Sequence, residues 1–268
     1  MGADIKKLRN RIKSVDSTLH LTKAMGLVAS SKIRRATDAM NRARQYESAF
    51  REAIRALVAC PECQKSPFMQ RREGARTRLI VIAGDRGLAG GYNANIFRAL
   101  RPYQDAELIP IGKRACDRAG KEANSAERFS SAEALELARA LCEDFKDGKY
   151  DRLGIVGTKY VSMLTQEAQV WWILPLERDG DLATHSAIFE PDEQSILNTA
   201  IAEYISALIM SAVRESFACE IASRRNAMDS AGKNAQQMID ELGLEYNRAR
   251  QGAITQELTE IVAGSDAN

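Results

Sequence analysis

Residues 192–264 read DEQSILNTAIAEYISALIMSAVRESFACEIASRRNAMDSAGKNAQQMIDELGLEYNRARQGAITQELTEIVAG, a stretch without proline. Pro191 precedes it, and Asp192 and Glu193 supply an N-cap and a negative charge that favour the start of a helix. At about 1.5 Å per residue, a helix of this length would span roughly 110 Å, several times the width of a compact domain. Helices in water are stabilised mainly by burying an apolar stripe. This one therefore needs a partner along its length.

The first 58 residues supply the pattern of such a partner. Small or apolar residues recur there at alternating spacings of three and four, with a mean close to the coiled-coil period of 3.5, which predicts a left-handed supercoil. The series is Ile5, Leu8, Ile12, Val15, Leu19, Thr22, Gly26, Ala29, Ile33, Ala36, Met40, Ala43, then Glu47 as an exception, Phe50, Ile54 and Leu57.

Charge also separates the two ends of the chain. Residues 1–58 hold 13 Lys and Arg against 5 Asp and Glu, a net charge of +8, whereas residues 194–268 hold 6 against 10, a net charge of −4. Opposite charges are typical of two elements that pack together. The second element shows a narrow stripe that suits a two-helix contact, made of Met228, Ala231, Ala235, Met238, Leu242, Tyr246, Ala249 and Ala253.

The middle of the chain has a different character. All six prolines lie between residues 61 and 191. Apolar runs at 79–83, 108–111, 153–156 and 170–174 predict strands, and they alternate with expected helices at 94–100, 113–119 and 132–145. Alternating strands and helices indicate a mainly parallel sheet covered on both faces, a Rossmann-like α/β domain. We expect a helix at 1–58, this domain at 59–191 and a helix at 192–268 that forms an antiparallel coiled coil with the first.

A glycine-rich turn, Gly84 to Gly91, follows the first expected strand, where a phosphate-binding loop would lie. It matches neither GxGxxG nor a Walker A loop. Two interpretations remain: a nucleotide site, or a tight turn that needs positive φ, with Asp85 and Arg86 paired locally. The first makes the chain an α/β nucleotide-binding enzyme with flanking helices.

Other chemistry has weak support in the sequence. Cys60 and Cys63 form a single CxxC, for which thiols at a helix end are favoured over zinc or redox chemistry. No acid–base pair or metal cluster is apparent, so no catalytic residue, metal or cofactor is expected. A coiled-coil scaffold or nucleic-acid binder is a further alternative, although a basic helix more often meets solvent or an acidic protein. The N-terminus does not resemble a signal peptide, and the apolar run at 196–213 is interpreted as a buried helix, so no transmembrane segment is expected.

Three groups of residues resemble the gamma subunit of F-type ATP synthase over nearly the whole chain. They are Lys23-Ala24-Met25 with Val28-Ala29-Ser30-Ser31-Lys32, the turn Asp85-Arg86-Gly87-Leu88 with Gly90-Gly91, and Tyr246-Asn247-Arg248-Ala249-Arg250-Gln251 running into Ile254-Thr255-Gln256-Glu257-Leu258-Thr259-Glu260-Ile261.

This resemblance implies a non-catalytic rotor subunit. In the family, a coiled coil stands inside a ring of three alpha and three beta subunits, and its foot lies on the membrane c-ring beside epsilon. Proton flow turns the foot, and the asymmetric shaft drives the beta subunits through their catalytic states. The protein would then be peripheral on the cytoplasmic side of a bacterial cell membrane, with no nucleic-acid partner, and the glycine turn would be structural.

The resemblance also implies which residues contact partners. Lys23 and Met25, with Arg224, Gln251 and Thr255 across from them, are expected near an acidic lever of the beta subunit. Arg250 and Glu257 belong to the same C-terminal run, and Phe189 with Glu190 matches the foot near the c-ring. Gly26, Gly243 and Gly252 stand where bulkier residues are expected, each at a cost of up to about 1 kcal/mol against alanine. The chain lacks the insertion that carries the regulatory disulfide of chloroplast relatives, so Cys60 and Cys63 are not expected to form that switch.

Overall fold

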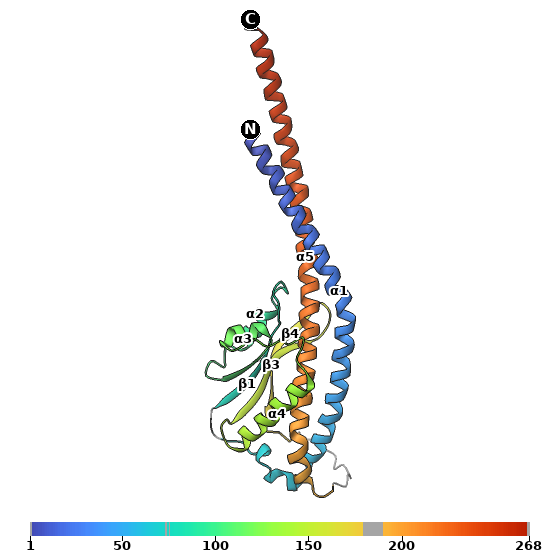
Figure 1. Ribbon diagram of the computed structural model, residues 1–268, viewed down its shortest axis with the longest axis vertical. Helices are drawn as coiled ribbons and strands as arrows, with labels where there is room; N and C mark the ends of the chain where they lie inside the picture. Colours follow the sequence, from blue (N-terminus) through green and yellow to red (C-terminus); the bar gives the residue numbers. More distant parts are fainter. Residues whose placement is uncertain (1, 73, 75, 179–189, 267–268) are drawn as a thin grey trace. The chain divides into compact units, whose positions relative to one another are not determined.

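A computed structural model describes residues 2–72, 74, 76–178 and 190–266. Two long helices, α1 (Gly2–Ala59) and α5 (Glu193–Asp266), enclose a mixed α/β segment in the sequence (Figure 1). The chain divides into two compact units, one of residues 31–223 and one that combines residues 1–30 with 224–268. Both long helices contribute to both units. The boundaries at 58/59 and 191/192 expected from the sequence stay a prediction.

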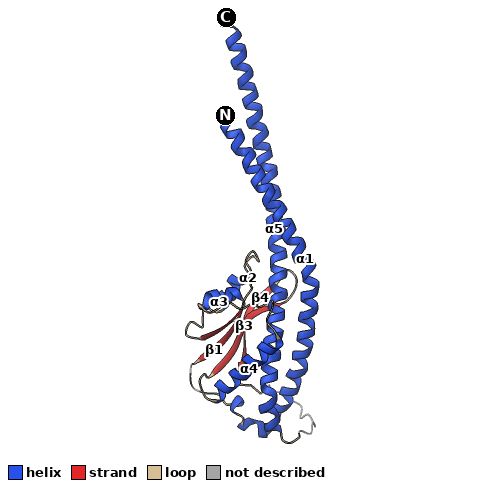
Figure 2. Ribbon diagram, viewed as in Figure 1, coloured by secondary structure: helices blue, strands red, loops and turns tan. Residues whose placement is uncertain are grey.

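The larger unit contains a four-stranded sheet in the order β2-β1-β3-β4 (Figure 2). The strands are β1 (Thr77–Ile82), β2 (Glu107–Ile111), β3 (Arg152–Tyr160) and β4 (Gln166–Leu174). β2, β1 and β3 are parallel, and β4 is an antiparallel edge strand that forms a hairpin with β3. The expectation of a mainly parallel sheet is confirmed. The reversed direction of β4 was not predicted from the sequence, because its run is continuously apolar, as expected of a buried parallel strand.

Both faces of this sheet are covered. Leu79 and Val81 point into a cluster with residues of α2 (Tyr92–Ala99) and α3 (Lys113–Ala119). Ile80 and Ile82 point into the larger cluster, which includes residues of α4 (Ser131–Lys146) and of both long helices. This alternation follows from the period of two in a strand. Two short 3-10 turns, η1 (Pro61–Lys65) and η2 (Pro67–Met69), join α1 to the sheet segment.

The smaller unit is an antiparallel helix pair. A Cβ atom added to Gly26 would lie 3.7 Å from the Cβ atom of Met228, and one added to Gly232 would lie 3.6 Å from the Oγ1 atom of Thr22. The two helices therefore approach closely where a glycine of one helix faces the other helix. Every residue of the expected α1 series, from Ile5 to Leu57, is buried or half-buried, which confirms the periodicity.

One position of the expected α5 stripe is wrong. Met238 is 40% exposed, and its neighbour Ile239 is half-buried in its place. The true series runs Ala235, Ile239, Leu242 and Tyr246, with spacings of four, three and four. A coiled-coil seam requires these alternating spacings.

α5 begins where the sequence indicated. The Asp192 carboxylate accepts hydrogen bonds from the backbone N–H (2.8 Å) and the hydroxyl (2.7 Å) of Ser195. The hydroxyl of Ser195, and then its backbone N–H, hold the pKa of Asp192 below its usual range. By length and composition, α5 includes one stretch of mean hydropathy 1.6 that could cross a membrane, and half of that stretch is buried within the protein.

Candidate functional site

The glycine turn lies at the carboxyl end of β1, directly before α2. Leu88 (φ 59°) and Gly90 (φ 56°) adopt left-handed backbone conformations. This confirms the expected tight turn with positive φ. Carboxyl ends of parallel strands are where α/β proteins commonly bind ligands, so the surroundings of the turn decide between its two interpretations.

Asp85 organises this end of the sheet. Its Oδ1 atom accepts from the backbone N–H groups of Lys113 (3.1 Å) and Ala126 (2.9 Å), and its Oδ2 atom accepts from the Ser125 hydroxyl (2.6 Å) and the Glu127 N–H (3.1 Å). Burial raises the pKa of Asp85, but these hydrogen bonds outweigh burial and hold the pKa below its ordinary value. Arg86 is not among the four donors, so the expected local pair with Asp85 is wrong. Asp85 instead ties the turn to α3 and to the 124–127 loop.

α5 occupies the space where a phosphate would bind. The side chain of Glu220 is buried, and a Cβ atom added to Gly84 would lie 2.8 Å from its Cδ atom. Next to it, the Ser223 hydroxyl donates to the carbonyl of Ala89 (2.8 Å), and the Tyr92 hydroxyl donates to the carbonyl of Ser216 (3.0 Å). A buried side chain this close to the first glycine leaves no room there for a phosphate. The turn is therefore built to receive a helix.

The nucleotide-binding interpretation has a direct test. We expect isothermal titration of the full chain with Mg-ATP or with NAD to give no binding heat beyond dilution, because the Glu220 side chain and the polar face of α5 fill the position of the phosphates. A saturable heat that disappears in Gly84→Ala would restore the enzyme hypothesis.

Asp85 predicts a pH-dependent contribution to stability. Asp85→Asn keeps the shape but turns an amide NH₂ toward two donors, which should cost about 2 kcal/mol at pH 7. Because the folded pKa is depressed, the wild-type advantage is present above the unfolded pKa of about 3.9 and is lost as the pH falls through the folded pKa. Melting temperatures across pH 2 to 7 measure it. Asp117→Asn, which alters an exposed pair with Arg114 (3.5 Å), is the control, and equal shifts in both variants would contradict the prediction.

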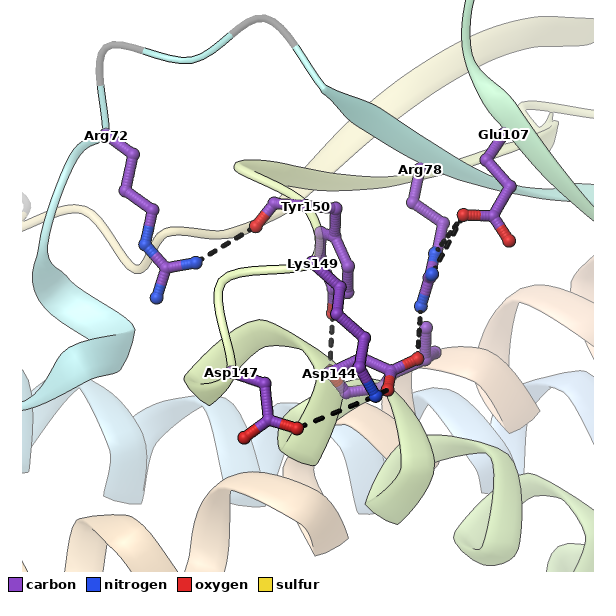
Figure 3. Close-up of polar contacts among 8 residues, drawn as sticks. Arg72, Arg78, Glu107, Asp144, Asp147, Lys149 and Tyr150 are labelled. Carbon is purple, nitrogen blue, oxygen red and sulfur yellow. Dashed lines mark hydrogen bonds and ion pairs between the residues drawn. The ribbon is translucent and has the colours of Figure 1, made fainter.

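A second polar cluster lies near the amino-terminal end of β1, at the end of the strand away from the glycine turn (Figure 3). Arg78, on β1, donates to Glu107 (2.8 Å) and to Asp144 at the end of α4 (2.7 Å), and its guanidinium lies 4.5 Å from the centre of the Tyr150 ring. Lys149 pairs with the second oxygen of Asp144 (2.6 Å). The hydrogen bond from Lys149, and then that from Arg78, lower the pKa of Asp144. Each of these charges has an opposite partner, so the cluster anchors α4 to β1.

The two cysteines of the CxxC follow the end of α1. Cys63 is fully buried, and burial, together with nearby Cys60 and Glu193, raises the pKa of its thiol to about 11. Burial also raises the pKa of Cys60. Thiolates bind metals and exchange disulfides, and these groups stay protonated at neutral pH. Among the described residues, no group of three or more His, Cys, Asp or Glu is placed to hold a metal.

The expected partner-contact residues lie mostly in the smaller unit, in two separate places. Lys23 is exposed and Met25 is half-buried, beside the contact of Gly26 with Met228, and Arg224 is half-buried at the start of the α5 segment. Arg250, Gln251, Thr255 and Glu257 are exposed, and the Thr255 hydroxyl donates to the carbonyl of Gln251 (2.9 Å).

These two groups are far apart along α5. Gln251 lies 23 residues beyond Met228, which corresponds to roughly 35 Å of helix. The expectation that Gln251 and Thr255 lie across from Met25 is therefore wrong for this helix register. The residues of the first group can share one contact, and those of the second group need another.

The smaller unit also exposes apolar side chains that were not expected from the sequence to contact a partner. On α1 these are Leu21 (58%), Leu27 (73%) and Val28 (57%). Near the end of α5 they are Leu244, Ile254, Leu258, Ile261 and Val262, all at least 47% exposed. Ile254, Leu258 and Ile261 are separated by four and then three residues, and Val262 lies four residues after Leu258, which places these side chains on one side of the helix. Exposed apolar residues gathered in this way mark a surface for another protein. The sequence holds a signal for them, because they are apolar residues at helical spacing that do not belong to the seam positions.

Of the two residues expected at the foot, Phe189 lies outside the described residues. Glu190 is described and exposed, just before α5. Its role in a contact stays a prediction.

Comparisons with known proteins identify close relatives. The sequence model described as ATP synthase matches residues 4–267. The chain is 36% identical over 301 residues to "ATP synthase gamma chain, sodium ion specific" of Acetobacterium woodii, with 100% of this chain and 99% of the relative covered. It is 38% identical over 282 residues to the ATP synthase gamma chain of Ruminococcus albus, with 98% of each covered.

Solved structures share the fold. A chain of Euglena gracilis mitochondrial ATP synthase (OSCP/F1/c-ring, rotational state 3) superposes with a TM-score of 0.69 at 18% identity, covering 100% of this chain and 95% of that one. A chain of the Tetrahymena thermophila mitochondrial ATP synthase central stalk and c-ring gives a TM-score of 0.58 at 21% identity, covering 79% and 99%.

Proposed function

The chain belongs to the ATP synthase family and, within it, to the gamma chains, and we propose that it is the central-stalk rotor of its complex. In this role it couples ion flow through a membrane c-ring to conformational cycling of catalytic beta subunits. The chain itself contributes no catalytic residue and no cofactor site. Protons as the coupling ion stay a prediction, since one of the relatives is sodium-specific.

The observation that carries this proposal is the exposed apolar surface of the smaller unit. A helix pair that buries its seam and still exposes Leu27, Leu258 and Ile261 lacks an apolar partner. The antiparallel register leaves the end of α5 unpaired, which suits a partner that encloses it. Since Gly26 faces Met228 and Thr22 faces Gly232, the first residues of α1 lie opposite about residue 250. The remainder of α5 continues as a single helix, and its exposed side chains, among them Gln251 and Leu258, are available to a ring of alpha and beta subunits.

The coupling follows from the unequal faces of this helix pair. Residues 1–58 carry a net charge of +8 whereas residues 194–268 carry −4, so a ring subunit meets different charges as the pair turns. Differential contacts with the states of a partner shift its conformational equilibrium. The rotor therefore drives the beta subunits through their states while the chemistry of ATP takes place in them.

We assign the two groups of contact residues to different depths of the ring. Lys23, Met25 and Arg224 face the acidic lever of the beta subunit, where a basic residue gains most from an acidic partner. Arg250, Gln251, Thr255 and Glu257 contact the ring further along α5. Glu190, with Phe189, contacts the c-ring near the larger unit, beside an epsilon subunit.

This arrangement makes the protein a peripheral component of a membrane complex. In a bacterial cell, it would lie on the cytoplasmic side of the cell membrane. Neither DNA nor RNA is a partner in this role.

Purification from native membranes tests the proposal. A chain with an affinity tag at residue 268 should retain alpha, beta and epsilon subunits and the c-ring in stoichiometric amounts after mild detergent extraction. A tagged copy of an unrelated peripheral membrane protein is the control. Recovery of the chain without alpha and beta subunits would refute the rotor function.

The contact assignment on α5 predicts a specific loss of coupling. Gln251→Leu removes an exposed amide next to Thr255 and should lower ATP synthesis in membranes severalfold, while the amount of assembled complex remains unchanged. Met25→Lys should do the same at the other depth, because it adds a charge at a half-buried position.

Gln237→Leu is the matched control for the change at residue 251. Gln237 is also an exposed glutamine on α5, and its amide donates to Glu241 one turn away (2.9 Å). We expect the Gln237→Leu variant to synthesise ATP in membranes at the rate of the wild type. Identical synthesis rates in all three variants would argue against the assigned contacts.

A further inference from the structure

α1, α5 and β3 meet at one polar junction in the larger unit. The Oε1 atom of Glu215, on α5, accepts from the Nη2 atom of Arg44, on α1 (2.5 Å), and from the backbone N–H of Tyr160, the last residue of β3 (2.7 Å). The same Nη2 atom of Arg44 also donates to the carbonyl of Tyr160 (3.3 Å). Three elements that are distant in the sequence thus form a closed triangle.

The junction is shielded from water on its Glu215 side. The Glu215 side chain is 12% exposed and that of Arg44 is 36% exposed. Charge-assisted hydrogen bonds in such surroundings are stronger and better defined than exposed ion pairs. Both backbone groups of Tyr160 take part, so the helices hold the end of the strand itself.

Neighbouring contacts fix the same side of α5 to the α/β segment. Ser216 bonds with Tyr92, the Cys219 thiol donates to the carbonyl of Thr158 (3.6 Å), and Ser223 bonds with the carbonyl of Ala89. These three contacts join the sheet segment to α5 alone. Arg44 extends the connection to α1, so that the two helices and the sheet are joined at one residue.

Directional bonds add a mechanical constraint to apolar packing. Apolar burial is non-directional and depends mainly on the area removed from water. Hydrogen bonds weaken steeply when distance or angle changes. A junction of this kind therefore resists a shear between the sheet and the segments of α1 and α5 that belong to the larger unit.

We propose that Glu215, with Arg44, is a positioning residue for energy coupling: it keeps both helices from turning relative to the α/β segment when the rotor is under load. This inference rests on the proposed rotor function. Rotation applied to the α/β segment then reaches α1 and α5 together, and both helices continue into the smaller unit.

A pair of glutamates provides a matched experiment. Glu215→Gln keeps the size of the side chain and an acceptor oxygen but removes the charge that holds Arg44. Glu47→Gln is the control. Glu47 is 13% exposed, lines one groove together with Arg44 and Glu215, and accepts from Arg51 in its own helix (2.7 Å). Arg44→Met removes the other half of the junction.

Three rates are measured in membranes that contain the complete complex. They are ATP hydrolysis, ATP-driven charge movement reported by a voltage-sensitive dye, and ATP synthesis driven by an imposed ion gradient. The dye makes the result independent of which ion is transported. Subunit content after purification gives the amount of assembled complex.

We expect Glu215→Gln and Arg44→Met to keep hydrolysis within about twofold of the wild type and to lower charge movement per ATP and synthesis at least threefold. The double variant should be no worse than either single one, since the two residues act as a unit. Glu47→Gln should match the wild type in all three rates.

Two outcomes would overturn the inference while the rotor function stands. One is coupling in Glu215→Gln equal to that in Glu47→Gln. The other is an equal fall in all three rates in proportion to the amount of complex, which would make Glu215 a structural residue only. Wild-type chain that purifies without alpha and beta subunits would overturn both the rotor function and this inference.

Discussion

The close approach of two antiparallel helices is the constraint on which the other features of this chain depend. Gly26 and Gly232 stand where the backbones meet, and Ala29, Ala36 and Ala235 continue the seam with small side chains. Small residues limit the apolar area that each turn can bury, so the pair requires many turns to become stable. This requirement accounts for the length of α1 and α5.

The α/β segment also serves the long helices. Its sheet has the usual ligand-binding edge of a Rossmann-like domain, but α5 lies against that edge with Glu220, Ser223 and Ser216. The polar groups that would bind a phosphate in an enzyme bind a helix here. Asp85 then holds the adjoining loops with four hydrogen bonds. The fold is thus used as a mount for a long helix, which illustrates that function depends on the site more than on the fold.

Much of this could be predicted from the sequence. Periodicity located both long helices, and the apolar runs located all four strands, because each pattern reflects burial on a fixed face. The apolar run of β4 indicated a strand but not its direction, because a continuous apolar run shows burial and not which way the strand points. It misplaced Met238, because two adjacent apolar residues compete for one seam position. The separation of Gln251 from Met25 depends on the register between the two helices, and the pattern within either helix does not determine that register. The Glu215 junction joins three distant segments, and no local pattern in the sequence reports such a meeting.

The seam ends near residue 250, and the final segment of α5 is a rod supported at one end only. About 15 residues of single helix extend for roughly 20 Å, and the deflection of such a cantilever under a sideways force grows with the cube of its length. Gly252 lies at the point of support, and a Cβ atom added there would find no heavy atom within 4 Å; the same holds for Gly243. Neither glycine is required by packing. Gly252 lowers the bending stiffness at the clamped end, where the bending moment is greatest, so that the single-helix segment of α5 can bend relative to the paired segment.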